Sequence, residues 1–366
     1  MRYTMHQKTR RRKSYMKKKL LTKRLGRRQK EEKEVPSRIT NETVAEHRER
    51  ILAGGRKFKY PVQYARHRLV INAILVTLAA LVLLAVIGWW QLYLMQNSSA
   101  FMYRITRILP VPVASVDGEY VPYRDYLVQY RGSEYYLSKY GEVKLDTKDG
   151  KTQLDYIKRQ SLEKAEQVAY ARQLARKYNI SVSDADIDNF IDQERNTANG
   201  RVSQDTYDAS IKMLYDQTVP DYRLSVGNGI LKNKVAFAID EDASLQVKKA
   251  TELLESTKAD FSKMAEEMKG MKGAKLVVGQ SGMVDKTSRY GGLRVSEAAK
   301  LEKGATSGAL KSTTDDGYYF VTVIDKSDTQ VNFAFLHIPL TKFNSDFAKL
   351  KSAGKINEYI SVVSKQ

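Results

Sequence analysis

An uncharged apolar stretch in the first third of the chain constrains the fold most strongly. From Leu69 to Met95 the sequence LVINAILVTLAALVLLAVIGWWQLYLM runs for 27 residues without a charged side chain. As a helix it would be roughly 40 Å long, enough to cross the ~30 Å hydrocarbon core of a bilayer. Trp89, Trp90 and Tyr93 gather at its C-terminal end, as aromatic side chains do at a membrane interface. We therefore predict a transmembrane helix over residues 69–95.

Two other interpretations of this stretch are weaker. The apolar part of a cleaved signal peptide is typically ~7–15 residues long and lies near the N-terminus. This stretch is longer and starts only at Leu69. A buried helix of a soluble protein is the other alternative.

The positive charge of the chain lies almost entirely before the apolar stretch. Residues 1–68 hold 23 Lys and Arg against 6 Glu and no Asp, which is +17 of the formal net charge of +20. After the stretch, only Arg104 and Arg107 lie nearby. Because Lys and Arg beside a span stay in the cytoplasm, we predict a single-pass protein of the cytoplasmic membrane. Its N-terminus would be cytoplasmic and the bulk of the chain extracytoplasmic.

Residues 1–68 form a basic tail that we predict to be largely disordered, since it has few large apolar side chains and repels itself. Three roles remain open for it: a solvated segment that only sets topology, a ligand of anionic lipid, or a binder of RNA or ribosomes. No nucleic-acid-binding motif occurs in the tail. We therefore expect nucleic acid as a partner through this tail or not at all.

The composition excludes several classes of chemistry. The chain has no cysteine, so it has no disulfides, thiolate metal sites or cysteine nucleophiles. Beyond residue 68 the only histidine is His337, which argues against a Ser-His-Asp hydrolase and against a multi-histidine metal site. Neither GxGxxG nor GxxxxGK[ST] occurs, so we interpret the glycines as turn residues. We predict no cofactor and no bound metal.

Residues 96–112 contain Pro110 and Pro112 and are predicted to be a linker, and residues 113–234 a mostly helical domain. This domain opens with two short strands joined by a turn at Asp117-Gly118. A long helix follows over 152–178, then further helices, the first of them capped at Ser183. Nothing in this domain resembles a catalytic constellation.

The pattern changes at Val235, and residues 235–330 are predicted to form a mixed α/β domain. VAFAI at 235–239 is interpreted as its first strand, and ALKST and GYYFVTVI as its last two. Residues 331–366 would add a strand, VNFAFLHI, and a helix over 343–363. The predicted fold class is α+β with one transmembrane helix.

The order of these segments resembles the SurA/PrsA/PpiD-like foldases of bacteria, in which a helical chaperone segment precedes a parvulin-type peptidyl-prolyl isomerase domain. VASVDGEYVPYRDY resembles the opening hairpin of that family, and QVAYARQLARKYNISVSDADIDNFI its long helix, turn and next helix. ADFSKMAEEM, GQSGMV, LEKGATSGALKST and GYYFVTV follow in the order that a parvulin uses. The resemblance covers roughly residues 113–325, and the basic tail departs from it.

The resemblance also implies where an isomerase site would lie. An active parvulin carries one His in its first strand and another after the glycine of its last strand, and the matching positions here hold Ala238 and Tyr319. The domain would therefore have no catalytic residues, and of the proline pocket only Met283 is recognisable. Phe335-Leu336-His337-Ile338-Pro339 also looks like a parvulin first strand; we interpret it as a vestigial repeat or an added edge strand, with His337 structural.

The sequence as a whole predicts a membrane-anchored extracytoplasmic chaperone that binds unfolded, newly translocated polypeptides. Its partners would be nascent secreted chains, the lipid bilayer and the protein-export machinery. Two alternatives remain: an active peptidyl-prolyl isomerase, and a membrane tether that works through its basic tail. Tyr123, Tyr126 and Tyr130 share one helical face, which is either core or a client-binding stripe. The candidate client-binding residues are Tyr123, Tyr126, Tyr130, Met283 and Tyr319.

Overall fold

The computed structural model describes residues 40–59, 61–141, 144–197 and 199–362, which fall into two compact units, 1–84 and 85–366. Helix α2 (Asn41–Lys59) and most of α3 (Pro61–Trp89) belong to the first unit. The predicted disorder of the tail is thus wrong for α2, which begins where Thr43 Oγ1 accepts a hydrogen bond from Thr40 N at 2.9 Å. For residues 1–39 that prediction lies outside the described residues.

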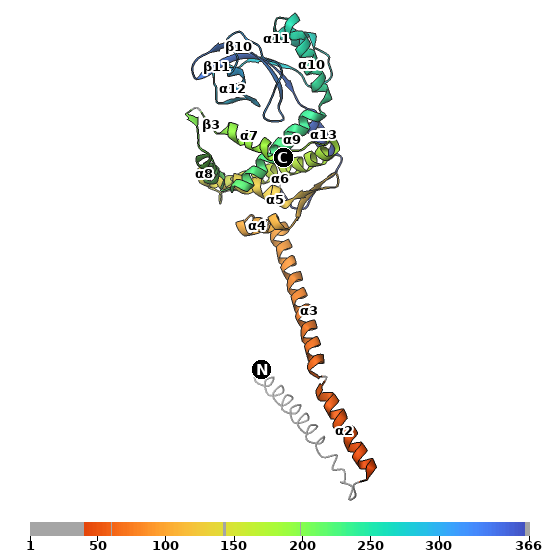
Figure 1. Ribbon diagram of the computed structural model, residues 1–366. Coiled ribbons are helices and arrows are strands. Elements are labelled where there is room, and N and C mark those ends of the chain that lie inside the picture. Colours follow the sequence, from red (N-terminus) through yellow and green to blue (C-terminus); the bar gives the residue numbers. More distant parts are fainter. Residues whose placement is uncertain (1–39, 60, 142–143, 198, 363–366) are drawn as a thin grey trace, which may run out of the picture. The chain divides into compact units, whose positions relative to one another are not determined.

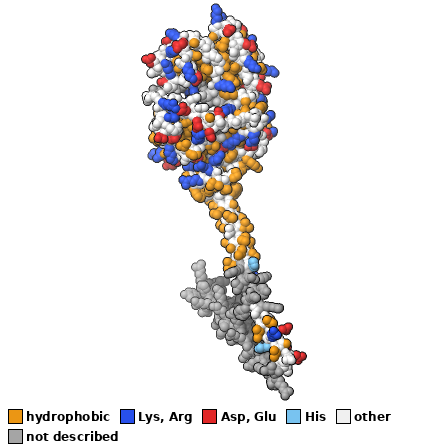
Figure 2. Space-filling view, in the orientation of Figure 1, with side chains coloured by type: hydrophobic (Ala, Val, Ile, Leu, Met, Phe, Trp, Pro, Cys, Tyr) orange, Lys and Arg blue, Asp and Glu red, His pale blue; other side chains and the backbone are white. Residues whose placement is uncertain are grey.

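Helix α3 confirms the prediction of a long apolar helix. It has 29 residues and is followed by a π-helical turn, η1 (Trp90–Leu94). Among the residues described, His67–Leu94 is the one helical stretch long and apolar enough to cross a membrane. Most of its large apolar side chains from Leu69 to Leu94 are exposed, and Figure 2 shows hydrophobic side chains along this part of the helix.

The second unit contains a helical lobe that follows the apolar helix. Ser or Thr side chains cap five of its helices by accepting a backbone N–H, at Ser99, Thr147, Ser183, Ser203 and Thr218. The lobe comprises α4 (Ala100–Ile108), β1 (Pro112–Val116), β2 (Glu119–Pro122), α5 (Tyr123–Tyr140), α6 (Lys148–Tyr178), α7 (Asp184–Glu194), β3 (Asn196–Thr197), β4 (Gly200–Arg201), α8 (Gln204–Tyr215) and α9 (Val219–Ile239). The predicted turn at Asp117-Gly118 is confirmed, with both residues at positive φ.

A sheet lobe completes the second unit (Figure 1). Its main sheet has the order β5-β11-β10-β9, and β6 also pairs with β11. The elements are α10 (Glu241–Ser256), α11 (Phe261–Glu267), β5 (Val277–Gln280), β6 (Val284–Asp285), β7 (Arg289–Tyr290), β8 (Leu293–Arg294), α12 (Val295–Ala299), β9 (Leu310–Lys311), β10 (Gly317–Lys326) and β11 (Gln330–Pro339).

Alternation along the two long strands separates two cores. Tyr318 and Phe320 of β10 belong to the larger core, which continues into the helical lobe, whereas Tyr319 and Val321 face a smaller core under α12. This period of two is what the apolar run GYYFVTVI requires of a strand buried on both faces.

Three sequence predictions about residues 235–363 are wrong. Residues 235–239 are the last turns of α9 rather than a strand, so the boundary predicted at 234/235 falls inside a helix. The strand predicted as a C-terminal addition, β11, is an inner strand of the sheet. The helix predicted over 343–363 ends early: α13 (Lys342–Ser352) is followed by Gly354 at positive φ and by β12 (Ile356–Glu358).

The residues predicted as a linker, 96–112, are also structured. They contain α4, which packs on α5, and the first residue of β1. Strand β12 pairs with β1 in a small sheet of order β12-β1-β2, so the end of the described chain returns to its first hairpin. The helical lobe is therefore completed by residues that are more than 200 positions apart in sequence.

Candidate functional site

The predicted tyrosine stripe on α5 is core. Tyr123, Tyr126 and Tyr130 are 0%, 2% and 4% exposed, and their rings pack in series, edge-on between the first two and stacked between the last two. Burial raises the pKa of all three phenols. Rings without accessible surface cannot hold a client, so the client-binding assignment of these three residues is wrong and the core interpretation is confirmed.

The first tyrosine of the stripe, Tyr123, instead binds the end of the apolar helix. The π-helical turn carries Leu92, whose carbonyl accepts a hydrogen bond from the Tyr123 hydroxyl at 2.6 Å. Tyr93 donates to Pro112 O at 2.6 Å, and Gln96 Nε2 donates to Ser361 O at 2.7 Å. The junction between the apolar helix and the helical lobe is thus a packed structure with its own hydrogen bonds.

A cavity of about 790 Å³ opens among the helices of this lobe. Its wall combines apolar side chains from the end of α6, the following turn, α7 and α9 with five arginines. The lining comprises Arg107, Arg124, Arg172, Ala175, Arg176, Asn179, Ile180, Ser181, Val182, Asp184, Ile187, Pro220, Asp221, Arg223, Leu224, Gly227, Asn228 and Leu231.

The arginines of the cavity have acidic partners beside or beneath them. Arg172 lies 2.6 Å from Asp125, which is 2% exposed. Arg176 contacts Glu119, and Arg223 contacts Asp184 and Asp188 on α7. Because most charges are compensated, the cavity does not select strongly for net charge. It offers apolar contact together with hydrogen-bond donors and acceptors, which are the groups that an unfolded polypeptide needs.

Two polar contacts connect helices that surround this cavity. The Tyr103 hydroxyl of α4 donates to Asp221 Oδ1 at 2.5 Å, and burial followed by this hydrogen bond raises the pKa of Tyr103. At the other side Lys234 of α9 lies 2.8 Å from Asp186 of α7, and this hydrogen bond holds the pKa of Asp186 down at about 2. Helices α4, α7 and α9 are therefore connected around the cavity by polar side chains.

A second groove, of about 410 Å³, lies between the two lobes of the second unit. It runs between α6, α7 and α9 on one side and residues 313–315 of the sheet lobe on the other. Lys232 and Asp315 lie 3.0 Å apart across it. Phe190, Val226 and Ile230 give this groove a mainly apolar wall.

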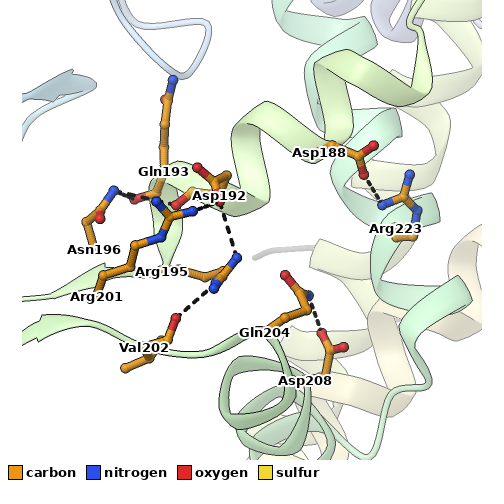
Figure 3. A network of polar contacts seen from close by, with 10 residues as sticks. All are labelled: Asp188, Asp192, Gln193, Arg195, Asn196, Arg201, Val202, Gln204, Asp208 and Arg223. Carbon is orange, nitrogen blue, oxygen red and sulfur yellow. Dashed lines mark hydrogen bonds and ion pairs between the residues drawn. The ribbon is translucent and has the colours of Figure 1, made fainter.

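A polar network lies at the end of α7 (Figure 3). Asp192 accepts hydrogen bonds from Arg195 and from Arg201 on β4, and Arg195 Nε donates to Val202 O at 3.0 Å. Two residues further along α7, Glu194 contacts Arg289 and Arg294 of the sheet lobe at 2.5 and 2.6 Å. The end of α7 therefore links the two lobes.

The sheet lobe brings His337 opposite Tyr319. The two residues pair in the β10–β11 register, and their rings stack with centroids 4.3 Å apart and planes 13° from parallel. The Tyr319 hydroxyl donates to Asp316, and His337 Nε2 lies 3.1 Å from Asp316 O. Burial raises the pKa of Tyr319, and the hydrogen bond to Asp316 adds to the rise.

The other predicted site residues lie apart from this cluster. Ala238 is an exposed residue of the helix α9, so it does not occupy the first strand of a sheet. Met283 lies in the turn between β5 and β6 and is 44% exposed, whereas Tyr319 is only 3% exposed. The structure does not bring these residues together into one client-binding surface.

Of the two interpretations of the strand that carries His337, a vestigial repeat or an added edge strand, the edge strand is wrong because β11 lies between β5 and β10. The resemblance of Phe335–Pro339 to a parvulin first strand was the signal that could have located the cluster.

Comparison with known proteins identifies the helical lobe. Residues 63–236 match the family described as the SurA-like N-terminal domain, a range that begins in α3 and ends in α9. This match supports the predicted resemblance to SurA/PrsA/PpiD-like foldases and suggests a chaperone-type role, with unfolded polypeptides in general as partners. The sheet lobe lies outside the matched range. Curated proteins give no match to the chain.

Proposed function

We propose that this protein is a membrane-anchored extracytoplasmic holdase that captures unfolded, newly translocated chains in the arginine-lined cavity of its helical lobe. The observation that supports this most is the position of the cavity. All of its lining residues, from Arg107 to Leu231, fall within the range matched by the SurA-like domain.

The wall of the cavity suits an extended chain of mixed sequence. Ile187 and Leu224 supply half-buried apolar contact, while Arg107 and Arg176 at the edge are largely exposed. Burying apolar surface contributes ~25 cal/mol per Å², so a few client side chains give weak and reversible capture. Transient binding is what a holdase requires.

The apolar helix would supply the anchor. Residues 67–94 would cross the membrane, and the basic residues before them would keep the N-terminus in the cytoplasm. A tethered cavity meets emerging chains at a high effective concentration, which compensates for weak affinity at a single site.

Aggregation of an unfolded client, measured with the full chain in nanodiscs, tests this proposal. We expect Leu224→Asn in the cavity wall to weaken the suppression of aggregation. Met213→Asn on α8, an exposed position outside the cavity, should leave suppression unchanged. A thermal melt of each variant separates loss of the cavity from loss of the fold. Equal suppression by the wild type and the correctly folded Leu224→Asn variant would contradict the proposal.

A second candidate function, prolyl isomerisation, is favoured by the pairing of His337 with Tyr319. The sequence argued against isomerase activity because Ala238 and Tyr319 stand where parvulin histidines are expected, and the first of these two grounds is lost because Ala238 lies on a helix. The burial of Tyr319 and the contact of its hydroxyl with Asp316 argue against an open proline site. Proline-limited refolding, which takes tens of seconds or longer without a catalyst, tests it: acceleration by the full chain that His337→Gln abolishes would establish the activity.

A further inference from the structure

Helix α4 presents an apolar face that stays exposed among the residues the structure describes. Phe101, Ile108 and Leu109 are 69%, 82% and 53% exposed. Phe101 and Ile108 are seven residues apart and therefore lie on one side of the helix. The opposite side of α4 carries Met102 and Tyr103, which are buried in the core.

This face continues the apolar surface at the end of the preceding helix. Trp89, Trp90, Leu94 and Met95 are all exposed, and α4 begins only five residues after Met95. Hydrophobic atoms gather where the helical lobe meets the apolar helix, as Figure 2 shows. Exposed apolar surface on this scale marks a site of contact rather than ordinary solvent-facing surface.

The junction is held in a fixed geometry. Ser99 caps α4 by accepting from Met102 N, and Arg131 of α5 donates to Ser98 O just before the cap. Together with the hydrogen bond from Tyr123 to Leu92 O, these contacts attach both ends of the junction to the same helix, α5. These contacts therefore hold α4 close to the end of the apolar helix.

Charge on α4 is placed for a membrane surface. Arg104 is exposed and lies next to Phe101 and Ile108 around the helix, and no acidic residue occurs in α4. If such a short helix lies parallel to a bilayer, its apolar side chains are buried among the acyl chains and its arginine lies beside the lipid phosphates.

We propose that α4 is an interfacial helix that seats the helical lobe on the outer surface of the bilayer. Phe101, Ile108 and Leu109 enter the boundary between headgroups and acyl chains, and Arg104 binds lipid phosphate. The proposal depends on the proposed crossing of the membrane by α3. Because Arg107 of α4 also lines the cavity, this arrangement holds the client cavity next to the membrane surface.

The absence of cysteine from the chain allows a direct test with single labels. The full chain carrying Phe101→Cys or Ile108→Cys is labelled with an environment-sensitive fluorophore and reconstituted into phosphatidylcholine–phosphatidylglycerol vesicles that contain a lipid nitroxide quencher. Leu81→Cys, in the apolar helix, reports membrane insertion, and Met213→Cys, on α8, is the exposed control away from α4.

We expect loss of fluorescence at positions 81, 101 and 108 and none at 213. Quenching at 81 without quenching at 101 and 108 would overturn the interfacial role of α4 while leaving the anchor intact. No quenching at 81 would contradict membrane crossing itself and the interfacial role with it. Arg104→Glu should reduce quenching at 101 and 108 but not at 81, and unchanged quenching would overturn the role of Arg104.

Discussion

The hydroxyl of Tyr123 donates a hydrogen bond to the carbonyl of Leu92 at 2.6 Å, and this contact joins the helical lobe to the end of the apolar helix. Both residues are buried. In the sequence, Tyr123 fitted either a core or a client-binding surface. The contact explains its structural role, because the hydroxyl reaches a carbonyl in the π-helical turn while the ring packs in the core.

Removing this hydroxyl should loosen the junction. We expect Tyr123→Phe to destabilise the second unit by about 1–2 kcal/mol, because the Leu92 carbonyl loses a buried donor. Thermal unfolding of the full chain in detergent micelles measures the change. Tyr120→Phe, at an exposed tyrosine of β2, is the matched control and should leave the melting temperature unchanged. Equal effects of the two variants would show that the hydrogen bond does not contribute.

Asp240 connects the helical lobe to the C-terminal helix and should be among the most sensitive positions. Its carboxylate accepts hydrogen bonds from Ala243 N at 3.1 Å, from Thr341 N at 2.7 Å and from Lys342 N at 3.0 Å. We expect Asp240→Ala to destabilise the protein by about 2–3 kcal/mol, since buried donors lose their acceptor. Asp260→Ala, which removes a more exposed cap on α11, should destabilise it by only about 1 kcal/mol. The order of the two variants in denaturant unfolding checks this, and a reversed order would contradict it.

The buried carboxyl of Glu166 on α6 should make stability depend on pH. Glu166 is fully buried, and burial raises its pKa to about 8; the Glu358 carboxylate adds to the rise, while Lys351 and Arg159 oppose it. The folded state therefore binds this proton more tightly than the unfolded chain. Its contribution to stability is greatest below the unfolded pKa, falls as the pH rises through the interval up to about 8, and then levels off.

Glu166→Gln removes this titration. We expect the variant to gain stability over the wild type as the pH rises, by on the order of a few kcal/mol at pH 9. Urea unfolding of the full chain at several pH values measures the effect. Glu163→Gln, a partly exposed neighbour on the same helix, is the control and should follow the wild-type pH profile. A Glu166→Gln profile parallel to the wild type would contradict the buried, protonated state.

Local sequence patterns predicted several elements correctly. The long helix α6, the capping box at Ser183 and the turn at Asp117-Gly118 follow from local patterns, and the structure confirms them. The strand predicted for VAFAI was wrong because five apolar residues fit the end of a buried helix as well as a buried strand. In the structure these residues continue the helix α9, which begins at the Thr218 cap and runs without interruption to Ile239.

The candidate site was less predictable because it depends on long-range contacts. No local pattern shows that β11 inserts between β5 and β10, and only that insertion places His337 against Tyr319. The arginine-lined cavity combines side chains from α4 to α9, with Arg107 and Leu231 more than a hundred positions apart. Tyr126 was ambiguous because a ring with a polar tip suits both a core and a client-binding surface.

Site-specific photo-crosslinking tests the central claim, capture of unfolded chains in the cavity, most directly. A photoreactive amino acid is placed at Leu224 in the cavity wall or, as the control, at Met213 on α8, and the full chain in nanodiscs is irradiated with an unfolded client. We expect crosslinks to the client from position 224, their loss once the client has folded, and none from position 213. Crosslinks of equal yield from both positions, or none from position 224, would contradict the account.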